Sequence, residues 1–318
     1  MRKFVNILLL NEIKNKYFKI SVLIIIIISG LVSYLSIKNY KILDNEILIV
    51  EKKLSYDEFI LKNEKGDYKN YLYQYDKYID IVKNHIKYED TLYKGNLLVI
   101  DNIYSIQVFL SLLSIIIGST LLIKEYKNGS LKYVLTKGFS RKQIYFSYLI
   151  VVILLTFILN IILLLFYLLF VLFFTGNFEL LTLKHIVINK HIVNELYLLT
   201  VIKKYFIYMI PVIMSGIYAF CLSLLVFNEV FSIIQFTLTS ILGLALNEWL
   251  LNFRVKLLTY TFIPYMDFTI FNNEIEVIKY NMMYGINLNV KNGILILLFY
   301  LIIFILFSFY SFIKKDIK

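Results

Sequence analysis

The chain has 318 residues, of which 59% are hydrophobic and 17% are charged, and its net charge is +11. Soluble domains carry about a quarter of charged residues, so this composition excludes an ordinary soluble globular protein. The single cysteine excludes an intrachain disulfide, and the positive charge requires no nucleic-acid partner, because Lys and Arg accumulate beside membrane spans.

Long apolar runs dominate the chain and predict its fold class. Uncharged runs of about twenty residues are typical of transmembrane helices, and helices satisfy their own backbone polar groups in lipid. We therefore predict an all-α integral membrane protein with a bundle of six transmembrane helices. The predicted spans are residues 18–37, 103–123, 146–174, 205–227, 230–251 and 293–313.

Residues 1–17 mix apolar and basic side chains ahead of the first span. They fit a short interfacial helix, although a charged lead-in to the span is the alternative. The following apolar run is longer than a signal-peptide core, and no A-x-A pattern follows it, so we expect an uncleaved first span.

Residues 38–102 form the longest polar insertion. Tyrosines and aliphatic residues at spacings of three and four predict an amphipathic helix within 68–86, and a weaker pattern of the same kind covers 42–61. The intervening "NEKGD" predicts a turn. We expect an extracellular helical hairpin whose tyrosine face packs against protein or binds a ligand.

The charge distribution predicts the orientation. The segments on the side of the N-terminus carry 14 Lys and Arg residues and four acidic residues. The segments on the opposite side carry 19 Lys and Arg residues and 17 acidic residues. Positive residues favour the inside, so both termini are expected in the cytoplasm of a plasma membrane. The predicted inner segments are 1–17 with Lys19, 124–145, 228–229 and 314–318, and the outer ones are 38–102, 175–204 and 252–292.

Residues 124–145 connect the second and third spans and carry six basic residues. Asn128-Gly129 predicts a turn, and Ser130 is expected to be the N-cap of the helix that follows. Gly138 is expected to end that helix in the left-handed conformation. Ser140 and Gln143 have the spacing of a capping box at the start of the next helix. Between them, a short helix has three apolar residues on one face: Leu131, Val134 and Leu135. The segment is either a coupling element or a surface linker whose lysines meet anionic lipid.

Residues 100–175 resemble the permease subunits of ABC type-2 exporters, also called type V ABC exporters. The motif of that family is matched by Glu125, Gly129, Ser130, Leu131, Leu135, Ser140 and Arg141. Two features depart from it, because Ser130 replaces the commoner Thr, and Gly138-Phe139 stands where a Pro-containing pair is usual.

The resemblance implies the membrane subunit of an ATP-driven exporter, paired with an identical or related second permease subunit. A separate ABC ATP-binding subunit would dock on the coupling helix through Glu125, Gly129, Ser130, Leu131, Val134, Leu135 and Arg141. That partner would hold ATP and Mg²⁺, and indeed no G-x-x-x-x-G-K-[ST] occurs in this chain. We expect no enzymatic activity, cofactor or metal on the chain itself. One of Lys124, Lys127 and Arg141 should pair with Glu125, and Arg141 is favoured because its guanidinium can hold a carboxylate with two parallel hydrogen bonds. The resemblance further implies short re-entrant helices within 252–292, where Pro264 interrupts an apolar stretch.

Polar and small residues within the spans pack helices together or line a transport path. Small residues recur at Ser111, Ser114 and Gly118 in the second span and at Ser215, Ala219 and Ser223 in the fourth. The candidate path residues are Gln235, Thr239, Gly243 and Asn247, at steps of four, together with Asn160.

Two other classes of function remain beside the exporter. A membrane enzyme is disfavoured because the sequence has no metal-ligand constellation within a span and no nucleophile motif. A non-transporting sensor or immunity protein, binding an extracellular ligand through residues 38–102, remains the alternative.

Overall fold

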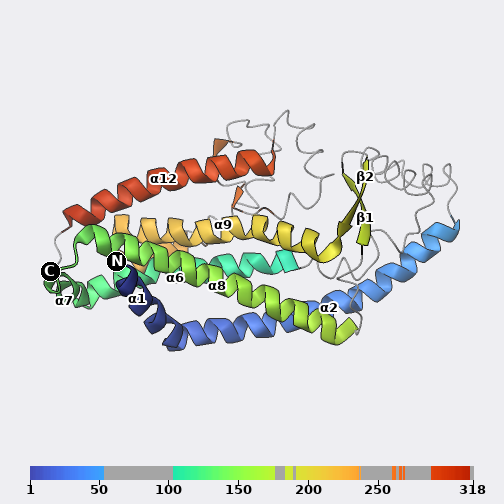
Figure 1. Cartoon of the computed structure of the whole chain (residues 1–318), viewed down its shortest axis with the longest axis horizontal. Coiled ribbons are helices and arrows are strands. Elements are labelled where there is room, and N and C mark those ends of the chain that lie inside the picture. The colour runs from blue at the N-terminus through green and yellow to red at the C-terminus, as the bar shows by residue number, and fades with distance from the viewer. Residues whose placement is uncertain are drawn as a thin grey trace. The chain divides into compact units, whose positions relative to one another are not determined.

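The structure is a computed structural model that describes residues 1–53, 103–175, 183–188, 191–235, 237, 260–262, 265–266, 268 and 288–315. Helices dominate these residues (Figure 1). The elements are α1 (Arg2–Lys14), α2 (Lys16–Lys53), α6 (Ile103–Lys127), α7 (Ser130–Thr136), α8 (Arg141–Thr175), β1 (Leu183–Ile188), β2 (His191–Leu196), α9 (Tyr197–Val226) and α12 (Val290–Lys314).

Within the described residues, five helices are long and apolar enough to cross a membrane, which is the character of an integral membrane protein. They correspond to the predicted first, second, third, fourth and sixth spans. Of the predicted fifth span, residues 230–235 and 237 are helical, and the rest lies outside the described residues. The segments that meet these criteria of length and composition are Lys16–Ser36, Phe109–Lys127, Arg141–Phe174, Val201–Val226 and Val290–Lys314.

A β-hairpin departs from the all-α prediction. Residues 175–204 were expected to form a loop, but β1 and β2 pair antiparallel with Ile188 opposite His191 and Leu183 opposite Leu196. The strands "LKHIVI" and "HIVNEL" are rich in β-branched residues, and two residues separate them, which is a common length for a hairpin connection. This local signal was present in the sequence.

Most of the residues in the predicted outer segments 38–102 and 252–292 lie outside the described residues. α2 continues as a helix to Lys53, beyond its spanning part. The predicted turn at 63–67 and the helix within 68–86 lie outside the described residues. So does most of 252–292, including Pro264.

The chain divides into two compact units, and the first contains residues 1–25, 107–163 and 207–318. Its core is a close contact of α6 with α9. A Cβ placed on Gly118 would lie 2.0 Å from the Gly216 carbonyl oxygen, so the two backbones touch. Two turns earlier on α6, the Ser111 carbonyl oxygen lies 3.5 Å from the hydroxyl of Ser215, the neighbour of Gly216. Small residues therefore pack these helices closely, which is one of the two roles expected for the stripes in the sequence.

α12 joins the first unit through aromatic residues. The Tyr218 hydroxyl donates to the Leu297 carbonyl at 2.6 Å, and the Tyr145 hydroxyl lies 2.7 Å from Ser308 Oγ. Gly293 lies against the rings of Tyr265 and Phe268. The opposite face of α12 is exposed and apolar, as expected of a helix that faces lipid. Its exposed residues include Leu295, Phe299, Ile302 and Leu306.

The second unit contains residues 26–106 and 164–206. In it, the Phe170 ring covers Gly30 at ordinary contact distance, and Tyr34 packs against Phe174 with ring centroids 5.8 Å apart. Ser29 and Ser33 are buried and donate to carbonyls of their own helix, which satisfies their hydroxyls without a partner helix.

Candidate functional site

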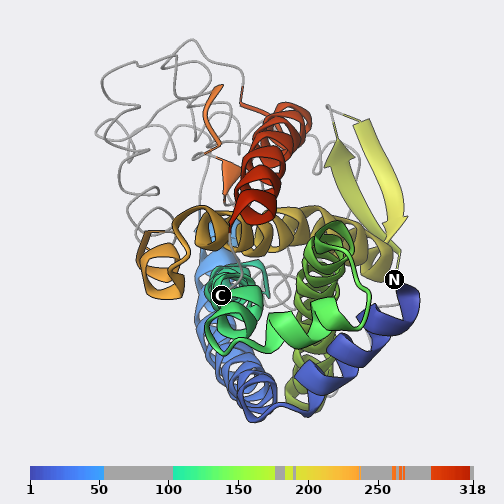
Figure 2. The same cartoon turned by 90° about the vertical axis from the view of Figure 1, so that its left-hand side faces the viewer.

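Several elements of the first unit meet at one end, which we call the basic end. It comprises α1, α7, the last turn of α6, the first turn of α8, residues 227–229 and the last turn of α12 (Figures 1 and 2). Its basic residues include Arg2, Lys3, Lys124, Lys127, Lys132, Lys137, Arg141, Lys142, Lys314 and Lys315.

Two glycines delimit α7. Gly129 has φ 72° and Gly138 has φ 84°, and no heavy atom lies within 4 Å of a Cβ placed on either. Glycine is needed there for the left-handed backbone and not for space. The predicted left-handed Gly138 is therefore confirmed. The predicted N-cap is wrong: Gly129 occupies it, and Ser130 is the first helical residue.

Ser130 instead closes the turn back onto α6. Its hydroxyl lies 3.0 Å from the Glu125 carbonyl oxygen and also donates to the Glu125 carboxylate. Glu125 thus holds the start of α7 against the end of α6. These two motif residues form one local unit across five positions of sequence.

The predicted capping box at the start of α8 is confirmed. The Ser140 N–H donates to Gln143 Oε1 at 2.9 Å, and the Gln143 N–H donates to Ser140 Oγ at 3.3 Å. The reciprocal bonds satisfy two of the unpaired amides at the helix start. α8 therefore begins at a defined residue directly after Gly138.

The predicted apolar face of α7 turns mostly inward. Leu131 is fully buried within the chain, so it anchors α7 and is not available to a partner. Val134 and Leu135 are half-buried. The outward face instead presents Tyr133, which is 63% exposed, with Lys137 Nζ lying 4.3 Å from its ring centroid.

Arg141 bonds to the end of α12 and not to Glu125, so that predicted pair is wrong. Its Nη1 donates to the carbonyls of Ile313 at 2.5 Å and Lys315 at 2.7 Å. The last carbonyls of a helix lack intrahelical donors and carry partial negative charge. A guanidinium satisfies both needs, and Glu125 is already bonded to Ser130.

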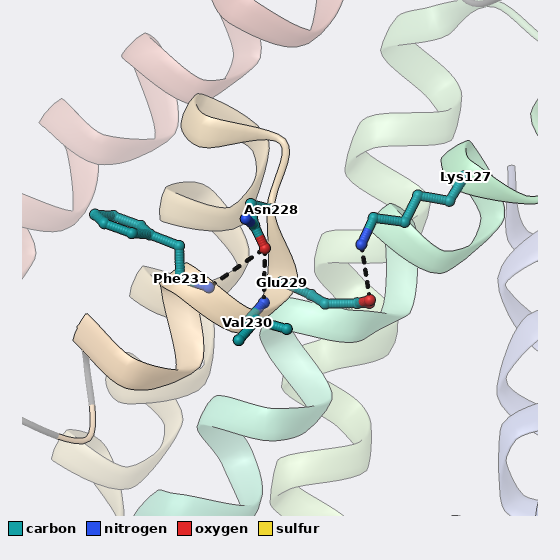
Figure 3. Close-up of polar contacts among 5 residues, drawn as sticks. All are labelled: Lys127, Asn228, Glu229, Val230 and Phe231. Carbon is teal, nitrogen blue, oxygen red and sulfur yellow. Dashed lines mark hydrogen bonds and ion pairs between the residues drawn. The ribbon is translucent and has the colours of Figure 1, made fainter.

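The turn between α9 and the following helical residues 229–235 adds a second link (Figure 3). Asn228 Oδ1 accepts from the amides of Val230 at 3.0 Å and Phe231 at 3.4 Å, as an N-cap does. Glu229 then pairs with Lys127 at 2.8 Å, which joins this turn to the end of α6.

Phe227 occupies the centre of that turn. Its φ is 54°, an uncommon value for a bulky residue. The ring packs beside Tyr126 at 5.1 Å, and Lys315 Nζ lies 4.7 Å from its centroid. These contacts hold the left-handed turn in place and draw the end of α12 toward it.

α1 docks on the turn between α7 and α8. The Phe4 ring stacks on Phe139 at 4.6 Å and meets Tyr148 edge-on at 6.3 Å. Phe139 is one of the residues that departs from the exporter motif, and here it receives α1. Sequence reasoning missed this contact because no short-range pattern links residues 4 and 139.

A family model described as a protein of unknown function (DUF2705) matches residues 60–318. The chain belongs to the DUF2705 family. The DUF2705 match covers α6 to α12, and with them every part of the basic end except α1. No curated protein and no solved structure matches the chain.

The candidate path residues of this DUF2705 protein fall in different places. Asn160 is fully buried, and its Nδ2 donates to the Thr156 carbonyl at 2.9 Å. Gln235 is exposed at the end of the helical residues 229–235. Thr239, Gly243 and Asn247 lie outside the described residues.

Gln107 was missed by the sequence analysis. It lies on α6 four residues before Ser111, on the small-residue face, and is 3% exposed. Among the residues that the structure describes, neither polar atom of its side-chain amide has a hydrogen-bond partner. Among the described residues, no cluster of His, Cys, Asp and Glu is suited to a metal.

Proposed function

We propose that the chain is the membrane-spanning permease subunit of an ATP-driven ABC exporter in the plasma membrane. It would form the translocation path with a second permease subunit, identical or related, and both termini would lie in the cytoplasm. ATP and Mg²⁺ would be bound by a separate ABC ATP-binding subunit. The observation that carries the proposal is α7, a short helix without acidic residues that lies between two left-handed glycines and connects two candidate spanning helices.

The contacts of α7 suit a lever. Leu131 and the bond of Ser130 to Glu125 join it to the chain, so a push on its outer face moves the end of α6. The capping box passes displacement to α8, and Arg141 passes it on to α12. Rigid elements joined by short turns can transmit such a displacement as rotation of the spans.

The outer face of α7 is suited to docking. Tyrosine is enriched among the residues that dominate binding energy, and charges at a rim mainly tune association. Exposed Tyr133, with half-buried Val134 and Leu135 beside it, would be the anchor, and Lys132 and Lys137 would lie at the rim.

The transport path is proposed along the face of Gln235, Thr239, Gly243 and Asn247, with Asn160 as a further candidate. The buried amide of Gln107, which has no hydrogen-bond partner among the described residues, supports a polar route beside α6, because movement of α6 against α9 would offer it to a cargo or to water.

The alternative function is a non-transporting sensor or immunity protein that binds an extracellular ligand through residues 38–102. It predicts no bound ATPase, so the composition of the purified complex separates the two proposals.

The test is purification of the full chain from its own membrane, followed by ATP hydrolysis measurements on the complex. A P-loop ATPase should co-purify. Tyr133→Ala should weaken its binding about 30-fold, the effect of losing a contact worth about 2 kcal/mol. Tyr310→Ala is the matched control, because Tyr310 is similarly exposed and also has a lysine 4.3 Å from its ring centroid.

Arg141→Ala should leave the ATPase bound but uncouple its hydrolysis from transport. If no nucleotide-binding subunit co-purifies, or if Tyr133→Ala binds it as tightly as Tyr310→Ala, the exporter proposal is wrong.

A further inference from the structure

α1 has two different faces, which explains why its periodicity is imperfect in the sequence. Phe4 and Val5 are buried, and Leu8, Leu9 and Glu12 are half-buried on the same side. The opposite side is exposed, and a single strip runs along it at steps of four, three and four: Lys3, Ile7, Leu10 and Lys14.

The strip combines apolar and basic side chains. Ile7 and Leu10 are 57% and 55% exposed at its centre, and a lysine stands at each end. The only acid of α1 is Glu12, which lies on the inward side and accepts a hydrogen bond from Asn15 at 3.2 Å. The outward face is therefore apolar and positively charged, with no acid to oppose it.

The position of α1 relative to the first span restricts what can cover this strip. Asn15 ends α1 with an extended backbone, and its Oδ1 accepts from the Tyr17 amide at the start of α2. The spanning segment begins at Lys16. Since a single residue separates α1 from a membrane span, α1 lies at the level of the lipid headgroups.

We propose that the outward strip of α1 binds anionic lipid headgroups, with Ile7 and Leu10 inserted among the acyl chains and Lys3 and Lys14 paired with phosphates. Apolar insertion and charge attraction together are what hold amphipathic helices at an anionic membrane surface. The occupant is the bilayer itself and requires no ATPase, so this inference is independent of the proposed function.

Bound lipid also acts on the turn between α7 and α8. The inward side of α1 carries Phe4, which stacks on Phe139, and Phe139 directly follows Gly138. Lipid that immobilises α1 therefore immobilises this ring contact and stabilises the turn. A neutral membrane holds α1 more weakly, and the turn opens more often.

The binding test uses the full chain with Ile7→Cys carrying an environment-sensitive thiol dye. Cys221, the one native cysteine, is fully buried, so labelling is selective. Phosphatidylglycerol is titrated into detergent micelles containing phosphatidylcholine, and the dye reports half-saturation. Soluble glycerol phosphate, which has the charge but no acyl chain, should give no response.

K3Q/K14Q should raise the phosphatidylglycerol concentration at half-saturation about 30-fold, since each lysine near an anionic surface contributes about fivefold. K132Q/K142Q is the matched control, because it removes two exposed lysines of the basic end outside α1. The lipid site is refuted if phosphatidylcholine gives the same response, or if both double variants shift the midpoint equally. An unresponsive dye also refutes it, because protein then covers the strip.

Hydrogen exchange tests the link to the turn. Phosphatidylglycerol should slow exchange of the amides of residues 129–140 in the wild-type chain, and Phe4→Ala should abolish that slowing while the dye response at position 7 remains. Equal slowing in the wild type and in Phe4→Ala would show that the turn does not respond to α1.

Discussion

Gly118→Ala should destabilise the protein strongly for so small a change. The added Cβ would lie 2.0 Å from the Gly216 carbonyl oxygen, 2.9 Å from its carbon and 3.2 Å from the Phe220 nitrogen. All three are main-chain atoms and cannot rotate away. The α6 and α9 backbones must therefore separate by more than an ångström at this point.

The cost follows from that separation. A gap of about 0.5–1 Å already loses a quarter to a half of the dispersion energy of a contact, and overpacking a core costs about 1–3 kcal/mol or more. Alanine has a higher helix propensity than glycine, which offsets at most about 1 kcal/mol of this cost. We therefore expect Gly118→Ala to be about 2 kcal/mol less stable than a variant with the same substitution at a glycine where a methyl group fits.

Gly30→Ala is that control. The nearest atom to its added Cβ is the Phe170 Cζ at 3.4 Å, an ordinary contact with a side chain that can adjust. This variant should be neutral or slightly stabilised. Thermal unfolding is followed with a thiol-reactive dye, because buried Cys221 becomes reactive only when the chain opens. If the two variants unfold at the same temperature, the close contact of α6 with α9 is not formed in the protein.

Two further predictions concern the basic end. Lys127→Glu should cost less than about 1 kcal/mol of stability, because the side chains of the Lys127–Glu229 pair are 46% and 26% exposed. The double variant Lys127→Glu/Glu229→Lys restores the pair with opposite charges and should recover most of the loss at low salt. An equal loss in the single and double variants would show that the pair contributes nothing. Lys132→Cys should react with an impermeant maleimide only from the cytoplasmic side, because Lys132 is exposed on α7; labelling from outside intact cells would reverse the proposed orientation.

Local signals in the sequence predicted the parts of the site that depend on neighbouring residues. The capping box of Ser140 and Gln143 spans three positions, and Gly138 takes the left-handed conformation that ends a helix. Hydropathy placed five helices close to their observed bounds. The β-branched residues of the two strands are a local signal as well, but the prediction of helices alone did not include it.

Long-range contacts were decided by the tertiary structure alone. Arg141 had a plausible carboxylate 16 positions away in Glu125, yet it bonds to carbonyls 172 and 174 positions along the chain. Leu131 and Leu135 share a predicted apolar face, but only the packing of α7 shows that Leu131 is buried and Tyr133 is exposed. The hydropathy of a residue predicts that it is removed from water. It does not predict whether the residue is buried within its own chain, against a partner or in lipid. That choice depends on which helices meet, which short-range patterns do not encode.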